Sequence, residues 1–126
     1  KDRDRLEAAY NDAGGVTAEF NRNILSVLNH RLGGDFDPGA FEHVAHFDPE
    51  NEWIEMLLRS TIDQTVGLEA IDLTVNFDAG ELMRTEISAK FRRDGVEREL
   101  GESGFAVERW WTDSHGDFAV SLSRPR

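Results

Sequence analysis

The spacing of the apolar residues changes once along the chain, from a helical period to an alternation typical of strands. Between residues 16 and 32, apolar side chains recur three and four positions apart, which predicts an amphipathic helix that ends at the glycine pair 33–34. The apolar face of this helix consists of Phe20, Ile24, Val27, Leu28 and Leu32. A shorter helix is predicted over residues 4–12, because the glycine pair 14–15 is costly inside a helix and suits its end.

One helical turn and then a series of strands are predicted after the long helix. Asp37 suits the N-cap of this turn and Pro38 its first helical position. Alternating apolar and polar residues predict strands over 42–47, 53–62, 65–68, 70–77 and 82–91. The apolar residues of 70–77 are expected to face a core; they are Ile71, Leu73, Val75 and Phe77. The short connections favour an antiparallel sheet.

Residues 91–126 have a pattern of their own. A helix is predicted over 91–103, followed by strands over 105–113 and 118–125 with a tight turn between them. A two-stranded ribbon behind one helix is only marginally stable alone, and Trp110 and Trp111 have no nearby segment to cover them. We therefore expect more sheet to pack against this part. The fold class predicted for the chain is α+β.

Composition and charge narrow the set of partners. The chain has 126 residues, of which 39% are hydrophobic and 31% charged, as is ordinary for a globular protein. Its net charge of −11 repels phosphates and anionic lipids, so neither nucleic acid nor a membrane is expected as a partner. There is no cysteine, which excludes thiolate chemistry and fits a cytoplasmic location. Because the sequence begins at Lys1 without methionine, we expect a piece of a longer polypeptide.

A metal site and a nucleotide loop are not favoured by the sequence. His43, His46, Asp48 and Glu50 have the chemistry of metal ligands, but residues three apart on a strand face opposite sides of the sheet. The glycine pair 14–15 has no strand before it and lacks the spacing of a phosphate-binding loop. We predict neither a metal site nor a cofactor site within this chain.

Polar residues within the predicted strand 82–91 are better candidates for a binding site. Glu86 and Ser88 project to the same side of this strand, about 7 Å apart at the backbone, which is near the width of a small ring with hydrogen-bonding atoms at both ends. Met56 offers an adaptable apolar surface, and Tyr10 offers a hydroxyl for a carboxylate. The pattern alone favours the ordinary interpretation, in which Glu86 pairs with a nearby arginine and the other side chains pack.

Four segments together resemble the C-terminal part of the L-histidine Nα-methyltransferases of ergothioneine biosynthesis. They read AAYNDAGGVTAEFNRNILSVLN, FDPGAFEHVAHFDPENEWIEMLLRS, RTEISAKFRRDGV and GFAVERWWTDSHGDFAVSLSRP. The resemblance implies a class I methyltransferase with a Rossmann-like core and a substrate-binding domain. Residues 1–90 would then be the histidine-binding domain, with helices and an antiparallel sheet. Residues 91–126 would be the last helix and β-hairpin of the methyltransferase core.

The resemblance also implies roles for the four candidate residues. In this family, the residue that matches Tyr10 holds the substrate carboxylate, those that match Glu86 and Ser88 bind the imidazole ring, and the one that matches Met56 packs against it. The implied substrate is L-histidine, the implied product trimethylhistidine (hercynine), and the implied cofactor S-adenosylmethionine. The family's cofactor loop lies upstream of the matched segments. This chain is therefore expected to need the missing N-terminal methyltransferase core, and to be inactive alone.

Two alternatives remain open from the sequence. A methyltransferase of the same family could act on another amino acid, because the residues that hold the amine lie outside the matched segments. A non-catalytic module that binds a small ligand would also keep Glu86 and Ser88.

Overall fold

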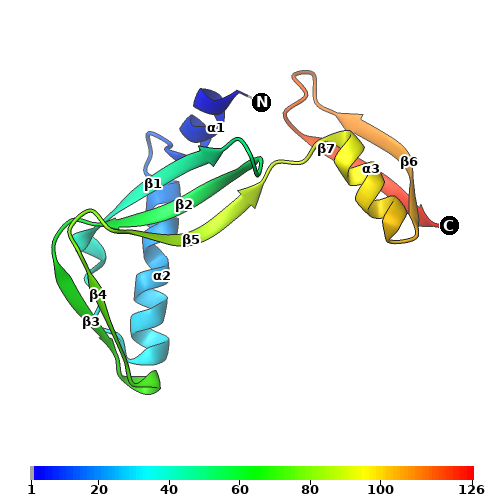
Figure 1. Ribbon diagram of the computed structural model, residues 1–126. Coiled ribbons are helices and arrows are strands. Elements are labelled where there is room, and N and C mark those ends of the chain that lie inside the picture. Colours follow the sequence, from blue (N-terminus) through cyan, green and yellow to red (C-terminus); the bar gives the residue numbers. More distant parts are fainter. Residues whose placement is uncertain (1) are drawn as a thin grey trace. The chain divides into compact units, whose positions relative to one another are not determined.

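A long helix crosses one face of a three-stranded antiparallel sheet in the computed structural model, which describes residues 2–126 (Figure 1). The chain divides into two compact units, of which the first ends at Lys90 and the second begins at Phe91. The first unit contains α1 (Arg3–Tyr10), α2 (Val16–Leu32), η1 (Pro38–Ala40), β1 (Phe41–Asp48), β2 (Trp53–Ser60), β3 (Gln64–Leu68), η2 (Glu69–Ile71), β4 (Leu73–Phe77) and β5 (Leu82–Ala89). The second contains α3 (Arg93–Glu102), β6 (Phe105–Thr112) and β7 (Ala119–Pro125).

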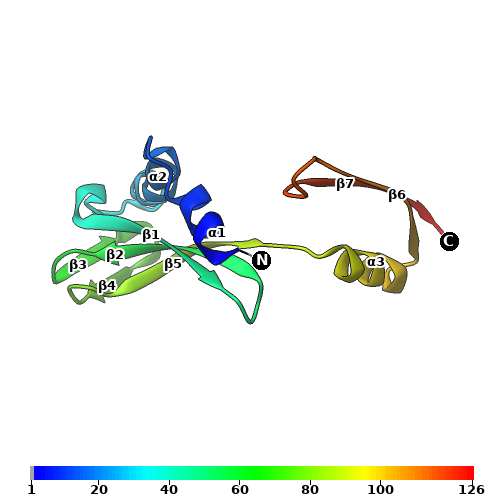
Figure 2. The ribbon, with the colours of Figure 1, turned by 90° about the horizontal axis from the view of Figure 1, so that it is seen from above.

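The main sheet has the strand order β1-β2-β5, and both helices of the first unit lie on the same side of it (Figures 1 and 2). We call this side the helix face. β3 and β4 form a separate two-stranded hairpin. The prediction of helices with antiparallel strands, an α+β fold, is confirmed. The predicted helix over 16–32 has the same bounds in the structure, and Gly33 ends it in the left-handed conformation with φ 59°.

The register between β2 and β5 decides which side chains of β5 reach the helix face. Met56 lies opposite Glu86 and Ile54 opposite Ser88, but beyond Met56 the register shifts, so that Leu57 lies opposite Arg84. Thr85 is the extra residue of this bulge. Because a bulge reverses the alternation of side chains, Arg84 lies on the other face of the sheet, where its guanidinium donates to Glu55 at 2.9 Å.

Two apolar clusters hold the helices on the sheet. The larger lies under α2 and contains three phenylalanines whose ring centroids are 5.4 to 6.2 Å apart. Its buried members are Leu25, Phe36, Ala40, Phe41, Leu58, Val66, Leu68 and Phe77. The smaller cluster contains Phe47, Ile54 and Met56, and Leu6 and Tyr10 of α1 pack against it. The short helix α1 therefore depends on the sheet for its own burial.

The strand predicted over 70–77 is shorter in the structure. Residues 69–71 form the 3₁₀ turn η2, and Asp72 closes this turn with a positive φ of 49°. Only Val75 and Phe77 of the expected apolar side are covered, whereas Ile71 and Leu73 are exposed by 52% and 44%. The prediction that all four apolar residues face a core is wrong, because two of them lie at the turn of the β3–β4 hairpin.

The second unit is a helix followed by a hairpin with a large apolar surface. β6 and β7 pair antiparallel, and Gly104 makes the turn from α3 into β6 with a φ of 82°. The large apolar residues of the hairpin with more than a third of their area exposed are Phe105, Trp111, Phe118, Val120 and Leu122. Arg93 lies over the ring of Trp110, 5.6 Å from its centroid. Within residues 2–126 no helix is long and apolar enough to cross a bilayer.

One buried amide joins α2 to all three strands of the main sheet. Asn21, only 3% exposed, donates from Nδ2 to the carbonyl of Leu57 at 3.0 Å and to Nδ1 of His43 at 2.9 Å. Its Oδ1 accepts from the hydroxyl of Thr85 at 2.5 Å. Since Thr85 is the extra residue of the bulge, Asn21 satisfies the polar groups that the irregular register leaves inside the protein.

Replacing Asn21 with alanine should lower the free energy of unfolding by about 1 to 3 kcal/mol, because buried partners would lose their hydrogen bonds. Urea denaturation followed by circular dichroism measures this change. Asn23→Ala is the matched control, since Asn23 lies on the exposed side of the same helix and its loss should change stability by less than about 0.5 kcal/mol. Equal losses in the two variants would contradict the role given to Asn21.

Candidate functional site

The four side chains predicted to form a site come together on the helix face, at the end of α1. The hydroxyls of Tyr10 and Ser88 are hydrogen bonded, with 2.8 Å between their oxygens, although 78 positions separate the two residues. Tyr10 also packs against the cluster that contains Met56. Glu86 lies directly opposite Met56 on the neighbouring strand, so both side chains project to the same side of the sheet. The roles predicted for these residues stay predictions.

Glu86 presents its carboxylate to solvent. Because of the bulge, Arg84 lies on the opposite face with Glu55, which removes the nearest arginine along the strand. Among residues 2–90, the described part of the first unit, the side chain of Glu86 has neither an ion pair nor a hydrogen bond. The ordinary interpretation, in which Glu86 pairs with a nearby arginine, is therefore wrong within this unit.

Lys90 is part of this group, and the sequence interpretation missed it. Its ammonium donates to Tyr10 Oη at 2.5 Å and to Ser88 Oγ at 2.7 Å. It also lies over the tyrosine ring, 4.6 Å from the centroid. The signal was available, because Glu86, Ser88 and Lys90 are two apart and alternate positions of a strand share a face. The site thus contains the carboxylate of Glu86, the hydroxyls of Ser88 and Tyr10, and the ammonium of Lys90.

The surroundings of Tyr10 change its acidity. Burial raises the pKa of Tyr10, but hydrogen bonds from Lys90 and Ser88, together with the charge of Lys90, outweigh burial and bring the pKa below its ordinary value of 10.0. The negative charge of Glu86 opposes this shift only weakly. A phenol with a lowered pKa is a stronger hydrogen-bond donor than an ordinary one, and so it suits an anionic ligand.

The backbone of Tyr10 is held from the sheet by His43. The Nε2 atom of His43 lies 2.8 Å from the carbonyl oxygen of Tyr10. A carbonyl only accepts, so Nε2 carries the hydrogen, and Nδ1 is then free to accept from Asn21. The buried amide that stabilises the bulge of β5 therefore also fixes the end of α1, which carries Tyr10. The sequence pattern gave no sign of this connection.

The turn between α1 and α2 is fixed by Asp12. Its carboxylate accepts from the backbone N–H groups of Val16 and Thr17, both at 2.9 Å, and so satisfies the first turn of α2. Gly15 adopts a φ of 71° in this turn. Hydrogen bonds from the side chain and backbone of Thr17 and from the backbone of Val16 lower the pKa of Asp12 to about 2. The position of Tyr10 relative to α2 depends on this short turn.

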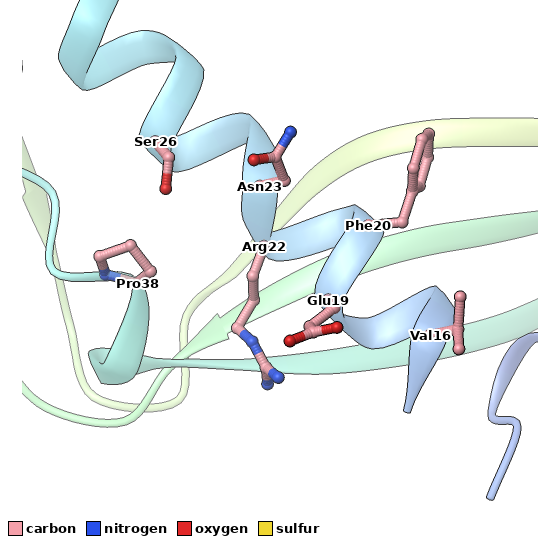
Figure 3. Close-up of a pocket in the computed structure, with 7 residues that line it drawn as sticks. All are labelled: Val16, Glu19, Phe20, Arg22, Asn23, Ser26 and Pro38. Atoms are coloured by element: carbon pink, nitrogen blue, oxygen red, sulfur yellow. The ribbon is translucent and has the colours of Figure 1, made fainter. Parts of the chain in front are cut away.

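The hollow drawn in Figure 3 lies elsewhere on the first unit. It has a volume of about 590 Å³ and is open to solvent along the outer side of α2. Its lining residues are Val16, Glu19, Phe20, Arg22, Asn23, Ser26 and Pro38, none of which belongs to the predicted site. The predicted residues instead lie beside the end of α1, where Glu86 is exposed, Tyr10 and Ser88 are half-buried and Met56 is buried.

The structure also bears on the sequence candidates for a metal site and a phosphate-binding loop. Between residues 2 and 126, no group of three or more histidine, cysteine, aspartate or glutamate side chains is placed to hold a metal ion. Gly14 and Gly15 lie between two helices, so they do not form the strand–loop–helix turn that binds such cofactors.

Comparison with known proteins defines the class to which the chain belongs. A family model described as "Histidine-specific methyltransferase, SAM-dependent" matches residues 1–125. The chain therefore belongs to the family of histidine-specific, SAM-dependent methyltransferases.

Two relatives carry the name histidine N-alpha-methyltransferase. One is from Mycobacterium tuberculosis (strain CDC 1551 / Oshkosh) and the other from Mycolicibacterium smegmatis (strain ATCC 700084 / mc(2)155). Each is 54% identical to this chain over 123 residues, which is 98% of the chain but 38% of the relative. The chain thus corresponds to a C-terminal portion, and more than half of each relative lies outside the match.

Because the pKa of Asp12 is lowered in the folded chain, we expect the stability of the fold to depend on pH in a specific way. The pKa of Asp12 is about 2 in the folded chain and 3.8 without its partners, so its contribution to stability is present above about pH 4 and is lost as the pH falls towards 2. Asp12→Asn removes this titration and weakens the cap. We expect a lower melting temperature at neutral pH and a smaller further decrease between pH 4 and 2. Calorimetry over this range tests the expectation, and an acid profile unchanged by the substitution would contradict it.

Proposed function

We propose that this chain is the substrate-recognition portion of a histidine-specific Nα-methyltransferase that uses S-adenosylmethionine. The observation that carries the proposal is the meeting of Tyr10 and Ser88 at 2.8 Å, on the same face as Glu86 and Met56. These four residues come from three separate segments of the sequence and match the family's substrate-binding positions by resemblance. Membership of a family described as histidine-specific supports the same substrate.

The chemistry of the four side chains suits the two ends of histidine. Glu86 accepts a hydrogen bond from a ring N–H, Ser88 binds the other ring nitrogen, and Met56 packs against the flat apolar part of the ring. Tyr10 donates to the substrate carboxylate. Methyl transfer to the α-amine needs an unprotonated amine held in line with the methyl group, so most of the contribution of this chain is orientation. The product is trimethylhistidine, which the resemblance assigns to ergothioneine biosynthesis.

Glu86 gives the site its selectivity. A ligand without a ring N–H would leave this carboxylate desolvated and without a partner, which costs more than the hydrogen bond itself contributes. Amino acids with apolar side chains are therefore rejected. An amino acid with another N–H-bearing ring is the competitor that the site discriminates least well.

The cofactor is assigned to the part of the family that this chain does not span. The glycine pair 14–15 does not form the strand–loop–helix turn of such cofactor sites, and more than half of each relative lies outside the match. Residues 1–90 then act as the substrate domain, and residues 91–126 complete the C-terminal edge of a Rossmann-like core. On this proposal the chain alone does not catalyse methyl transfer.

The outer side of α2 supports an interaction with that missing core. Four apolar side chains spaced four, four and three positions apart form a stripe on this helix, which we call the α2 stripe. They are Val16, Phe20, Ile24 and Val27, exposed by 68%, 63%, 38% and 44%. A continuous apolar stripe from Val16 to Val27 is unusual on a surface that stays in water. We assign it to the N-terminal methyltransferase core, because that is the portion of the relatives absent from this chain.

The proposed role of Glu86 can be tested in a chimera that joins this chain to the N-terminal portion of the Mycolicibacterium smegmatis relative. Glu86→Ala should raise the KM for histidine about tenfold to a hundredfold and change kcat less, because a charge-assisted hydrogen bond to the ring is lost. Turnover of histidine by the chimera is the measurement.

Two controls accompany this test. Glu42→Ala removes a carboxylate on β1 that is paired only loosely with Arg59, at 4.0 Å, and should leave the kinetics unchanged. The 126-residue chain alone should show no turnover. If Glu86→Ala leaves the KM unchanged, or if the chimera prefers another amino acid, the proposed substrate is wrong. A chimera that binds histidine without turnover would favour a non-catalytic binding module.

The α2 stripe is tested with the two halves as separate polypeptides. Phe20→Ser together with Val27→Ser should abolish binding of this chain to the N-terminal portion of the relative, measured by calorimetry, because both side chains lose their buried partners. Both residues are exposed here, so the variant should keep its circular dichroism spectrum. Asn23→Ser together with Ser26→Ala, on the neighbouring side of the helix, is the control. Binding that survives the substitutions in the stripe would refute this interface.

A further inference from the structure

Lys90 makes two short hydrogen bonds and a ring contact at the site, and no role has been given to it. Its ammonium lies 2.5 Å from Tyr10 Oη and 2.7 Å from Ser88 Oγ, and these two oxygens are 2.8 Å from each other. The three polar groups therefore form a closed triangle. The backbone of Lys90 is fixed as well, because its N–H donates to the carbonyl of Glu52 at 2.7 Å.

We infer that Lys90 is a positioning residue, which directs the hydroxyl hydrogen of Tyr10 towards the carboxylate of the ligand. This inference rests on the proposed function, since it concerns how the amino-acid substrate is held.

The directions of the hydrogen bonds follow from the chemistry of the three groups. An ammonium only donates, so the oxygens of Tyr10 and Ser88 each accept one hydrogen bond from Lys90. One of the two hydroxyls donates to the other. The triangle therefore leaves one O–H donor and one acceptor position for a ligand.

The ligand decides which hydroxyl keeps its hydrogen. A carboxylate only accepts, so Tyr10 binds it only if Ser88 donates to Tyr10 and the hydrogen of Tyr10 points outwards. Ser88 Oγ then offers its remaining lone pair to an N–H group of the ring. Without Lys90, either hydroxyl could rotate to satisfy itself with water. Because the ammonium occupies one lone pair of each oxygen, the pair is limited to one outward donor and one outward acceptor, which match a carboxylate beside an N–H-bearing ring.

The positions of the charged groups of Glu86 and Lys90 match the two ends of a bound amino acid. Glu86 and Ser88 share a face of β5, and the ammonium of Lys90, just after the strand, donates to Ser88 Oγ, so the anion lies on one side of Ser88 and the cation on the other. An amino acid with its ring N–H towards Glu86 and its carboxylate towards the hydroxyl of Tyr10, which Lys90 holds, matches this order of charges. His43, the titratable group that reaches Tyr10 from β1, bonds its backbone carbonyl and not its hydroxyl.

The contact between Lys90 and Tyr10 can be measured in the 126-residue chain itself, because Tyr10 is its sole tyrosine. Ultraviolet absorbance of the phenolate then reports the titration of Tyr10 alone. Lys90→Met should move this titration to higher pH, since the hydrogen bond and the charge that favour the phenolate are both lost, whereas Lys90→Arg should keep most of the effect. Arg59→Met, which removes a cation elsewhere in the same unit, should leave the titration in place. Equal titrations for the unsubstituted chain and Lys90→Met would overturn the inference.

The role in binding is tested with histidine and with histamine, which lacks the carboxylate, by calorimetry on the chimera. Lys90→Met should weaken histidine binding about tenfold or more and leave histamine binding nearly unchanged. Tyr10→Phe should do the same, and the double variant should lose little more, because Lys90 acts through Tyr10. Equal weakening of both ligands, or additive losses in the double variant, would overturn the positioning role. If the unsubstituted chimera fails to bind histidine at all, the proposed function is wrong, whereas histidine binding that does not respond to Lys90→Met refutes this inference alone.

Discussion

The hydrogen bonds of the buried Asn21 amide are the interaction on which the rest of this structure depends. One side chain bonds the carbonyl of Leu57 on β2, the ring of His43 on β1 and the hydroxyl of Thr85 on β5. Each partner belongs to a different strand, so α2 cannot shift along the sheet without leaving buried polar groups unsatisfied. The same network reaches the backbone of Tyr10 through His43. Stability and the placement of the site are thus maintained by the same few groups.

The bulge at Thr85 links this network to the chemistry of the site. In a regular strand, Arg84 would share a face with Glu86 and could neutralise it. The extra residue turns Arg84 to the opposite face, where it pairs with Glu55, and leaves the carboxylate of Glu86 exposed beside Tyr10. A carboxylate kept apart from the nearest arginine is well suited to recognise a donor on a ligand. An irregularity of the backbone therefore has a direct consequence for what the surface can bind.

Much of the first unit could be predicted from local patterns, because its helices and strands have strong periodicity and clear end signals. The helix over 16–32 was predicted to the residue, and the strands around Met56 and Glu86 differ from the prediction only at their ends. The prediction failed at Ile71 and Leu73, which alternate correctly but lie at the turn of a hairpin with nothing over them. Alternation indicates that an apolar side chain favours burial, but not whether another segment packs over it. The contribution of Lys90 was missed because only Glu86 and Ser88 were considered on the polar side of the predicted strand, although Lys90 is the next alternate residue.

The sequence by itself determined the family, the order of helices and strands, and the identity of four candidate ligand-binding residues, since these depend on local periodicity and on motifs that are contiguous in the chain. Only the tertiary structure decided which side chains meet. It brought Tyr10 to Ser88 across 78 positions, added Lys90 to the pair, and separated Glu86 from Arg84 through one extra residue in β5. Register and long-range contacts depend on how the whole sheet packs against α1 and α2, and so no single segment of the sequence contains them.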